Sequence, residues 1–68
     1  MRIELNGAPS ELAADATLAD AVRASGATAE PRGVAAALDG EVVPRGEWEG
    51  TPLREGQAVE VLIAIQGG

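Results

Sequence analysis

Apolar and polar residues alternate at both ends of the chain, and this pattern predicts two half-buried β-strands. The first is Arg2-Ile3-Glu4-Leu5, and the dipeptide Asn6-Gly7 that follows it favours a tight hairpin turn. We therefore expect a second strand around residues 10–14. The last strand is expected to run from Ala58 to about residue 66. Alternation assigns its core-facing residues as Val59, Val61, Ile63 and Ile65, and its outward-facing residues as Glu60, Leu62, Ala64 and Gln66.

Between these segments the apolar spacing changes to that of a helix. Apolar residues recur at helical intervals over residues 18–25, which predicts a short amphipathic helix. Thr17 precedes it as a candidate N-cap, and Asp20 supplies an acid three residues later, as in a capping box. Gly26 is placed to end the helix in a left-handed conformation.

A second hairpin is predicted in the middle of the chain. The apolar residues 34–38 form the first strand, and the dipeptide Asp39-Gly40 that follows favours a two-residue turn. Residues 41–43 form the antiparallel second strand, which ends at Pro44 because proline has no N–H to donate. The resulting order, β-β-α-β-β-β, lets the first and last strands pair in parallel at the centre of one sheet. We therefore predict an α+β fold of the ubiquitin-like β-grasp type, a mixed five-stranded sheet with one main helix packed on one face.

The composition excludes most catalytic chemistry for the chain itself. With 68 residues, the sequence is expected to form one small domain over residues 1–68. It contains no Cys, His or Lys, so thiolate, imidazole and Schiff-base mechanisms have no residues to perform them. The usual zinc and iron–sulfur ligands are missing as well. We expect a protein that is acted upon, without catalysis or a bound cofactor of its own.

The net charge and the apolar pattern argue against two kinds of partner, nucleic acid and a membrane. Eleven acidic residues against five arginines give a net charge of -6, and this charge argues against nucleic acid as a partner. The start of the chain alternates instead of showing a signal peptide, and no apolar run approaches the length of a membrane span. We expect a cytoplasmic protein with no membrane partner.

The terminal pair Gly67-Gly68 is the candidate site of chemistry. A terminal glycine presents its α-carboxylate without a neighbouring Cβ, and the glycine before it lets the backbone adopt almost any conformation. Residues 66–68 are therefore expected to form a flexible tail that an enzyme can thread through a narrow channel. The alternative is an ordinary frayed chain end.

Three further residues are candidates for partner contact. Leu62 and Ala64 are apolar on the outward face of the last strand, close to the tail, although scattered exposed apolar residues are common. Arg45 is the third candidate, and its alternative role is to hold its own loop by binding a carbonyl group. Trp48, the single aromatic residue, is interpreted as a packing residue at the sheet edge.

Residues 34–48, followed by Leu53-Arg-Glu-Gly-Gln57 and the glycine pair, closely resemble the ThiS family, the sulfur carriers of thiamine biosynthesis. The resemblance covers nearly the whole chain. The glycine tail is shared with every ubiquitin-like carrier, whereas Leu38 to Arg45 together with Trp48 point to the thiamine branch.

Two positions depart from the family's pattern. Asp39 stands where the family often has Asn, which is a conservative exchange in a turn. Gln66 stands where a small residue is more usual before the glycines, and this exchange bears on how the tail enters its enzymes.

The resemblance implies a route by which the tail is loaded. A ThiF-like adenylyltransferase would use ATP and Mg to convert the Gly68 carboxylate to an acyl-adenylate. A sulfur donor such as a cysteine desulfurase would then supply the sulfur of a thiocarboxylate on Gly68. A ThiG-like thiazole synthase would receive that sulfur. In this scheme Gly67 provides clearance, and Gln66 begins the tail.

Three other functions remain open from the residues alone. A small subunit of molybdopterin synthase would share the tail chemistry and deliver sulfur to a different synthase. A ubiquitin-like protein modifier would start from the same adenylate and become joined to lysines. A passive interaction module would carry the glycine tail without using it.

Overall fold

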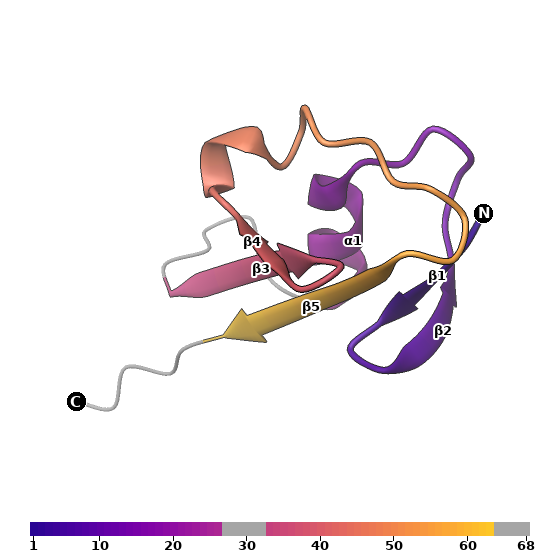
Figure 1. The fold of residues 1–68 in the computed structure, drawn as a ribbon, viewed down its shortest axis with the longest axis horizontal. Coiled ribbons are helices and arrows are strands. Elements are labelled where there is room, and N and C mark those ends of the chain that lie inside the picture. The colour runs from indigo at the N-terminus through magenta and orange to yellow at the C-terminus, as the bar shows by residue number, and fades with distance from the viewer. Residues whose placement is uncertain (27–32, 64–68) are drawn as a thin grey trace.

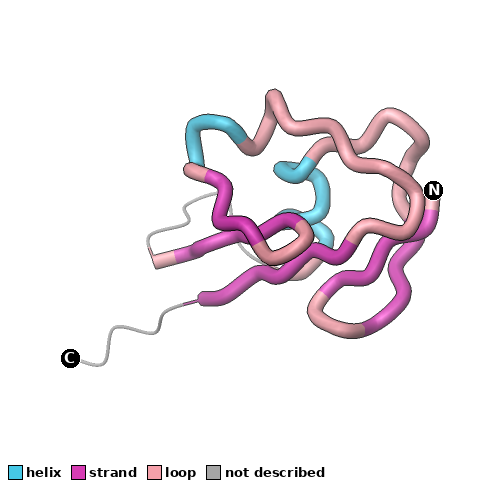
Figure 2. The backbone as a smooth tube through the Cα atoms, in the orientation of Figure 1, coloured by secondary structure: helices cyan, strands magenta, loops and turns pink. Residues whose placement is uncertain are grey.

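The computed structural model describes residues 1–26 and 33–63 of the chain (Figure 1). Strands and helices follow one another in the predicted order, as the backbone trace in Figure 2 also shows. The strands are β1 (Arg2–Leu5), β2 (Ala8–Glu11), β3 (Val34–Leu38), β4 (Glu41–Val43) and β5 (Ala58–Ile63); the helices are α1 (Leu18–Ala24) and the short 3-10 helix η1 (Arg45–Glu47).

The five strands form one mixed sheet in the order β2-β1-β5-β3-β4. The last strand, β5, lies in the centre and pairs with β1 in parallel, with Glu4 opposite Ala58. On its other side β5 pairs with β3 in antiparallel register, with Ala36 opposite Val61. The two outer pairs, β1 with β2 and β3 with β4, are antiparallel hairpins. This topology, with one α-helix, confirms the predicted β-grasp fold.

Both hairpins turn on two residues with positive φ. Asn6 and Gly7 have φ of 51° and 82°, and Asp39 and Gly40 have φ of 49° and 87°. This is the left-handed geometry that matches the twist of the flanking strands in a two-residue turn. The second strand therefore starts directly after the turn, with Ala8 opposite Leu5. The prediction of a strand around residues 10–14 placed it too late.

The capping box predicted at the start of α1 is present. The Thr17 amide donates a hydrogen bond to Asp20 Oδ2 at 2.8 Å, and the Thr17 hydroxyl donates to the same oxygen at 3.3 Å. The Thr17 amide and then the Arg23 guanidinium, which lies 2.6 Å from Asp20 Oδ1, lower the pKa of the Asp20 carboxyl. At the other end Gly26 takes a φ of 94°, as expected for the residue that ends a helix.

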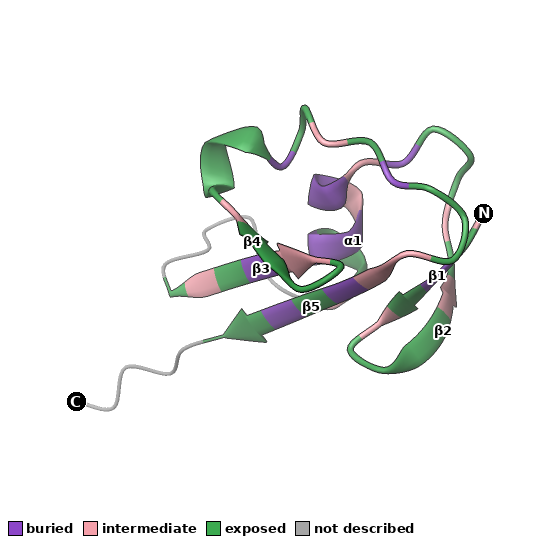
Figure 3. Cartoon of the chain, in the orientation of Figure 1, coloured by how far each residue is buried: buried purple, intermediate pink, exposed green. Residues whose placement is uncertain are grey.

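The core lies between α1 and one face of the sheet, where Figure 3 shows the buried residues gathered. Its members are Ile3, Leu18, Ala19, Ala21, Val22, Ala36, Trp48, Leu53, Val59 and Val61. Trp48 is 6% exposed and its indole Nε1 donates to the Val43 carbonyl oxygen at 2.8 Å. The packing role predicted for Trp48 is confirmed.

The core face of β5 is shorter than predicted. Val59 and Val61 are buried as expected, but Ile63 is 54% exposed, so its assignment to the core was wrong. A helix of seven residues is about 10 Å long, whereas a strand of six residues spans about 20 Å, so α1 cannot cover all of β5. Ile65, assigned to the same face, lies outside the described residues.

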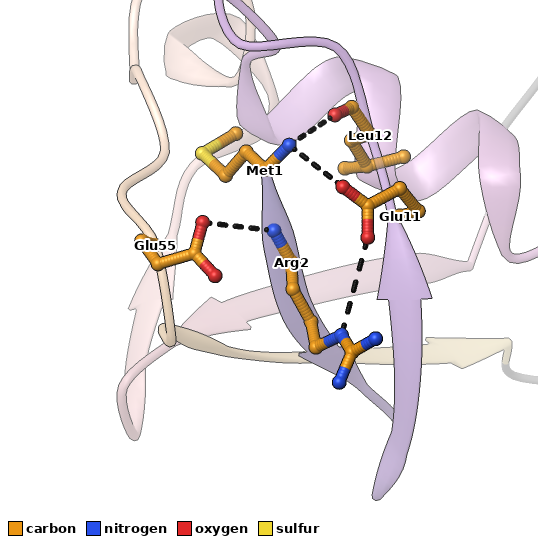
Figure 4. A network of polar contacts seen from close by, with 5 residues as sticks. All are labelled: Met1, Arg2, Glu11, Leu12 and Glu55. Atoms are coloured by element: carbon orange, nitrogen blue, oxygen red, sulfur yellow. Dashed lines mark hydrogen bonds and ion pairs between the residues drawn. The ribbon is translucent and has the colours of Figure 1, made fainter.

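A polar network ties the start of β1 to the segment that leads into β5 (Figure 4). The Met1 ammonium donates to Glu11 Oε2 at 2.9 Å and to the Leu12 carbonyl oxygen at 2.8 Å. The Arg2 amide donates to Glu55 Oε1 at 3.0 Å, and the Gly56 amide donates to the Arg2 carbonyl oxygen at 2.7 Å. The turn before β5 is thereby fixed against the first hairpin.

Candidate functional site

The candidate site is the end of β5, the central strand that leads to the glycine tail. Of the predicted site residues, the structure describes Leu62 and Arg45. Ala64, Gln66, Gly67 and Gly68 lie outside the described residues. The geometry of the site is therefore that of the strand that carries the tail and of the surface around it.

The start of β5 is held by the side chain of Asp39, which lies in the turn between β3 and β4, and by that of Gln57, which directly precedes the strand. Asp39 Oδ1 accepts a hydrogen bond from the Ala58 amide at 2.9 Å, and Asp39 Oδ2 accepts one from Gln57 Nε2 at 3.0 Å. Gln57 Oε1 in turn accepts from the Arg54 amide at 2.7 Å. The Ala58 amide is the main cause of a lowered pKa at the Asp39 carboxyl, followed by Gln57. These bonds fix where the central strand begins.

The middle of β5 is held on the other side by Asn6. The Asn6 amide donates to the Val59 carbonyl oxygen at 2.9 Å, and Asn6 Oδ1 accepts from the Val61 amide at 2.8 Å. The Asn6 side chain therefore continues the contact between β1 and β5 by one step beyond the last residue of β1. The strand enters the site from a fixed position.

The face of the sheet opposite α1 carries exposed apolar side chains near the end of β5. Leu62 is 70% exposed, as predicted for its outward position, and lies opposite the exposed Ala35 of β3. Val42 of β4 is 76% exposed, and its cross-strand neighbour is Ala37. We call Ala35, Val42 and Leu62 the outer apolar patch.

Val42 is an exposed residue that was not among the predicted candidates for partner contact. Its neighbour Val43 packs against the core, so strand alternation alone places Val42 on the opposite face. That signal was present in the sequence once residues 41–43 had been recognised as a strand.

Acidic side chains share this face with the outer apolar patch. Glu60 lies on β5 and Glu4 on β1, both exposed, and neither forms an ion pair with another residue in the described ranges. Their negative charge favours a partner surface that is basic beside an apolar contact.

Arg45 begins η1 and is exposed. Within residues 1–26 and 33–63, its guanidinium donates no hydrogen bond, so the alternative role of holding its loop has no support there. Trp48 holds that loop instead, through its bond to the Val43 carbonyl oxygen.

Two other kinds of site, a metal site and a membrane span, have no candidate among the described residues. In that part of the chain no three acidic side chains converge in a way that could hold a metal ion. None of the helices described is both long enough and apolar enough to cross a membrane.

The sequence matches the model of the ThiS family over residues 3–68, a range that includes the glycine tail. This chain belongs to the ThiS family. Comparison with curated protein sequences gave no significant match.

Solved structures agree with membership of the ThiS family. The crystal structure of the thiamine biosynthesis protein ThiS from Geobacter metallireducens is similar over 100% of both chains, with 34% identity and a TM-score of 0.77. A solution structure of a thiamine biosynthesis protein from the same organism gives 30% identity and a TM-score of 0.79, over 100% of this chain and 88% of the other. The similarity therefore includes the sheet that carries the site.

Proposed function

We propose that this ThiS family member carries sulfur for thiamine biosynthesis as a thiocarboxylate on Gly68. The observation that carries the proposal is the family match, which extends through the terminal glycine pair. In a sequence without Cys, His or Lys, the Gly68 carboxylate is the group best suited to accept sulfur. The chain then acts as a protein co-substrate of thiamine biosynthesis enzymes.

The carboxylate must be activated before sulfur can replace one of its oxygens. In the proposed first step, an oxygen of the Gly68 carboxylate attacks the α-phosphorus of ATP, and magnesium pyrophosphate leaves. The product is an acyl-adenylate, formed by a ThiF-like adenylyltransferase that binds both ATP and Mg. The chain itself holds no nucleotide or metal in this scheme.

Sulfur transfer follows by displacement at the same carbonyl carbon. Hydrosulfide attacks the carbon and forms a C–S bond. Where the donor is a cysteine desulfurase, which carries its sulfur as a persulfide, a thiol reductant supplies the two electrons that release this hydrosulfide and is itself oxidised to a disulfide. The C–O bond to AMP breaks, AMP leaves, and one proton is released. The resulting thiocarboxylate passes its sulfur to a ThiG-like thiazole synthase, and tethering raises the effective concentration of that sulfur at the acceptor.

The described part of the chain supports this scheme by presenting the tail from a rigid strand. β5 is flanked by β1 and β3 and begins at the Asp39–Ala58 hydrogen bond. Five residues follow Ile63, and a chain of that length reaches at most about 18 Å. The enzyme surface that holds the carrier must therefore lie within that distance of its active site.

The outer apolar patch is the surface we assign to partner contact. Leu62 was predicted for this role together with Ala64 and Arg45, and exposed Val42 extends the surface to β4. Val42 and Leu62 lie on the same face of the sheet, on either side of β3, and exposed apolar residues on one face beside a reactive end favour a docking surface. Gly67 and Gln66 keep their proposed roles in the tail that enters the enzyme.

Intact-mass spectrometry tests the proposal directly. The full chain is incubated with a ThiF-like enzyme, MgATP and a sulfide source, and the expected product is heavier by the difference between one sulfur and one oxygen. A variant that lacks Gly68 is the control and should gain no mass. No gain in the wild type, under conditions that load a known carrier, would contradict the proposal.

Three different results would point to the other functions. Attachment to larger proteins through their lysines would identify a protein modifier. Capture of a molybdopterin-synthase large subunit in place of a thiazole synthase would assign the chain to the other sulfur pathway. A wild-type chain that binds its partner but gains no sulfur under conditions that load a known carrier would indicate a passive interaction module.

A further inference from the structure

The edge of β5 that faces β1 is only partly occupied. Figure 1 shows β5 running on past the hairpin of β1 and β2. The last paired residues are Leu5 and Val59, and Asn6 extends the contact as far as the Val61 amide. Beyond that point β5 continues through Ile63, paired with β3 alone among the described residues.

Along β5, the backbone amide and carbonyl groups of successive residues point alternately toward β1 and toward β3, and the observed hydrogen bonds show which residues face each side. The Val59 carbonyl oxygen and the Val61 amide both bond Asn6, so odd-numbered residues of β5 direct their backbone groups toward β1. The Ala58 carbonyl oxygen accepts from the Asp39 amide at 2.8 Å, so even-numbered residues face β3. By alternation the Ile63 amide and the Val61 carbonyl point to the open side, where no residue of the described ranges pairs with them.

The two outer edges of the sheet, formed by β2 and β4, are protected against pairing with another chain. β2 carries Pro9, whose nitrogen has no hydrogen to donate. β4 has three residues and is followed by Pro44. Short strands and prolines are the usual protection of sheet edges against pairing with another chain. The open stretch of β5 is also short within the described residues, but it contains no proline and belongs to the longest strand of the sheet.

The side chains beside this open edge are apolar on both faces. Leu62 points to the outer face and is 70% exposed, while Ile63 points to the helix face and is 54% exposed. A strand laid against the edge would therefore find backbone groups to bond and an apolar side chain on either face. This combination is the one used when an extended peptide adds to a sheet.

We propose that the enzyme that activates Gly68 adds an extended strand of its own to β5 at Val61–Ile63, beside Asn6. This inference rests on the proposed function and names the contact that aligns the tail. The occupant is assigned to the enzyme because the edge is continuous with the segment whose end the enzyme must receive, at most about 18 Å from Ile63. Backbone pairing here fixes the direction in which the tail leaves the carrier.

Amide hydrogen exchange at Ile63 is the direct measurement. The wild-type carrier is compared free and in complex with the adenylating enzyme, with the Val61 amide as an internal reference that is already bonded to Asn6. We expect exchange at Ile63 to slow by at least about tenfold in the complex. An unchanged rate at Ile63 in a complex that still adenylates Gly68 would overturn the proposal.

A matched pair of variants tests the same contact by function. Ile63→Pro removes the open amide without removing a bond to β3, whereas Ile63→Val keeps the amide and a branched apolar side chain. We expect the KM for the carrier in adenylation to rise about tenfold for I63P and less than about twofold for I63V. Equal values for the two variants would overturn the proposal, and if I63P does not fold, the exchange experiment decides alone.

Two further outcomes have distinct meanings. Protection of Ile63 that grows with the concentration of the carrier alone would assign the edge to a second copy of this chain and overturn the enzyme as occupant. Failure of the wild type to be adenylated at all would contradict the proposed function, and this inference would fall with it.

Discussion

Asn6 Oδ1 accepts a hydrogen bond at 2.8 Å from the Val61 amide, 55 residues further along the chain. One residue thus both forms the first hairpin turn, with a φ of 51°, and holds the central strand. The two roles place different demands on the side chain. The turn requires a residue that tolerates the left-handed region, and the bond to Val61 requires an acceptor.

Substitutions at Asn6 should separate these roles. Asn6→Gly keeps the turn but leaves the amide of the buried Val61 without its acceptor, which should cost about 1–3 kcal/mol of unfolding free energy. Asn6→Ala loses the bond and also strains the turn, so it should be less stable than N6G by about 1–2 kcal/mol. Asn6→Asp keeps both features and serves as the control. Urea denaturation measures the free energy of unfolding of all three variants. Equal values for N6A and N6G would show that the positive φ at residue 6 does not strain an alanine.

Trp48 provides a second stability test because it combines burial with one hydrogen bond. Trp48→Ala removes the whole buried indole and should cost about 3–5 kcal/mol. Trp48→Phe keeps most of the ring but leaves the Val43 carbonyl oxygen without its donor, at about 1–2 kcal/mol. Far-UV circular dichroism follows unfolding in both variants, which lack tryptophan. A W48F variant as unstable as W48A would show that the hydrogen bond dominates.

Acid should weaken the fold through Asp39. Hydrogen bonds from the Ala58 amide and then from Gln57 lower the pKa of this carboxyl in the folded state, from 3.8. Its contribution is therefore complete above the unfolded pKa and is lost as the pH falls through the folded pKa. Asp39→Asn should lower Tm at neutral pH, and its difference from the wild type should shrink in strong acid. Thermal unfolding across that pH range measures the effect.

Glu49→Gln is the control for Asp39. Glu49 is exposed and has no hydrogen bond or ion pair to another described residue, so the variant removes the same charge without a contact. A constant difference between D39N and the wild type at all pH values would contradict the role of the charged carboxylate.

The outer apolar patch should matter for loading and not for folding. Leu62→Glu and Val42→Glu change side chains that are already exposed, so Tm should stay close to the wild-type value. Adenylation by the partner enzyme should lose about tenfold or more in kcat/KM, because each variant places a charge in an apolar contact. Pyrophosphate exchange at varied carrier concentration measures this ratio.

Ala14→Glu adds the same charge in the exposed loop between β2 and α1, away from the patch, and should load normally. If A14E lost as much activity as L62E, the general negative charge of the carrier would be the cause. Wild-type activity of both patch variants would remove the patch from the docking surface.

The turns and the helix start were predictable because their signals are local. Asn6-Gly7 and Asp39-Gly40 adopt the positive φ values that their residue types favour, and Thr17 with Asp20 forms the expected cap. The exposure of Ile63 could not be predicted in this way, because it depends on how far a short helix reaches across the sheet.

Contacts between residues far apart in the chain could not be predicted from the sequence either. The Asp39 carboxylate binds the Ala58 amide 19 residues away, and no spacing rule connects an acid in one turn to an amide at the start of another strand. Leu53 is 6% exposed although it belongs to no strand or helix, and its burial depends on the loop folding back over the core. At the site, the positions of Leu62 and Arg45 are now known, and the roles of Gly68, Gly67, Gln66 and Ala64 stay predictions.

The contacts of the Met1 ammonium have a further consequence under the proposed activation of Gly68. An acyl-adenylate reacts with free amines, and carriers crowded together would acylate one another. The sequence contains no Lys, and the Met1 ammonium is engaged with Glu11 and the Leu12 carbonyl oxygen. In the proposed scheme, an adenylated carrier would therefore meet few free amines on other copies of the chain, and the absence of Lys would suppress self-conjugation.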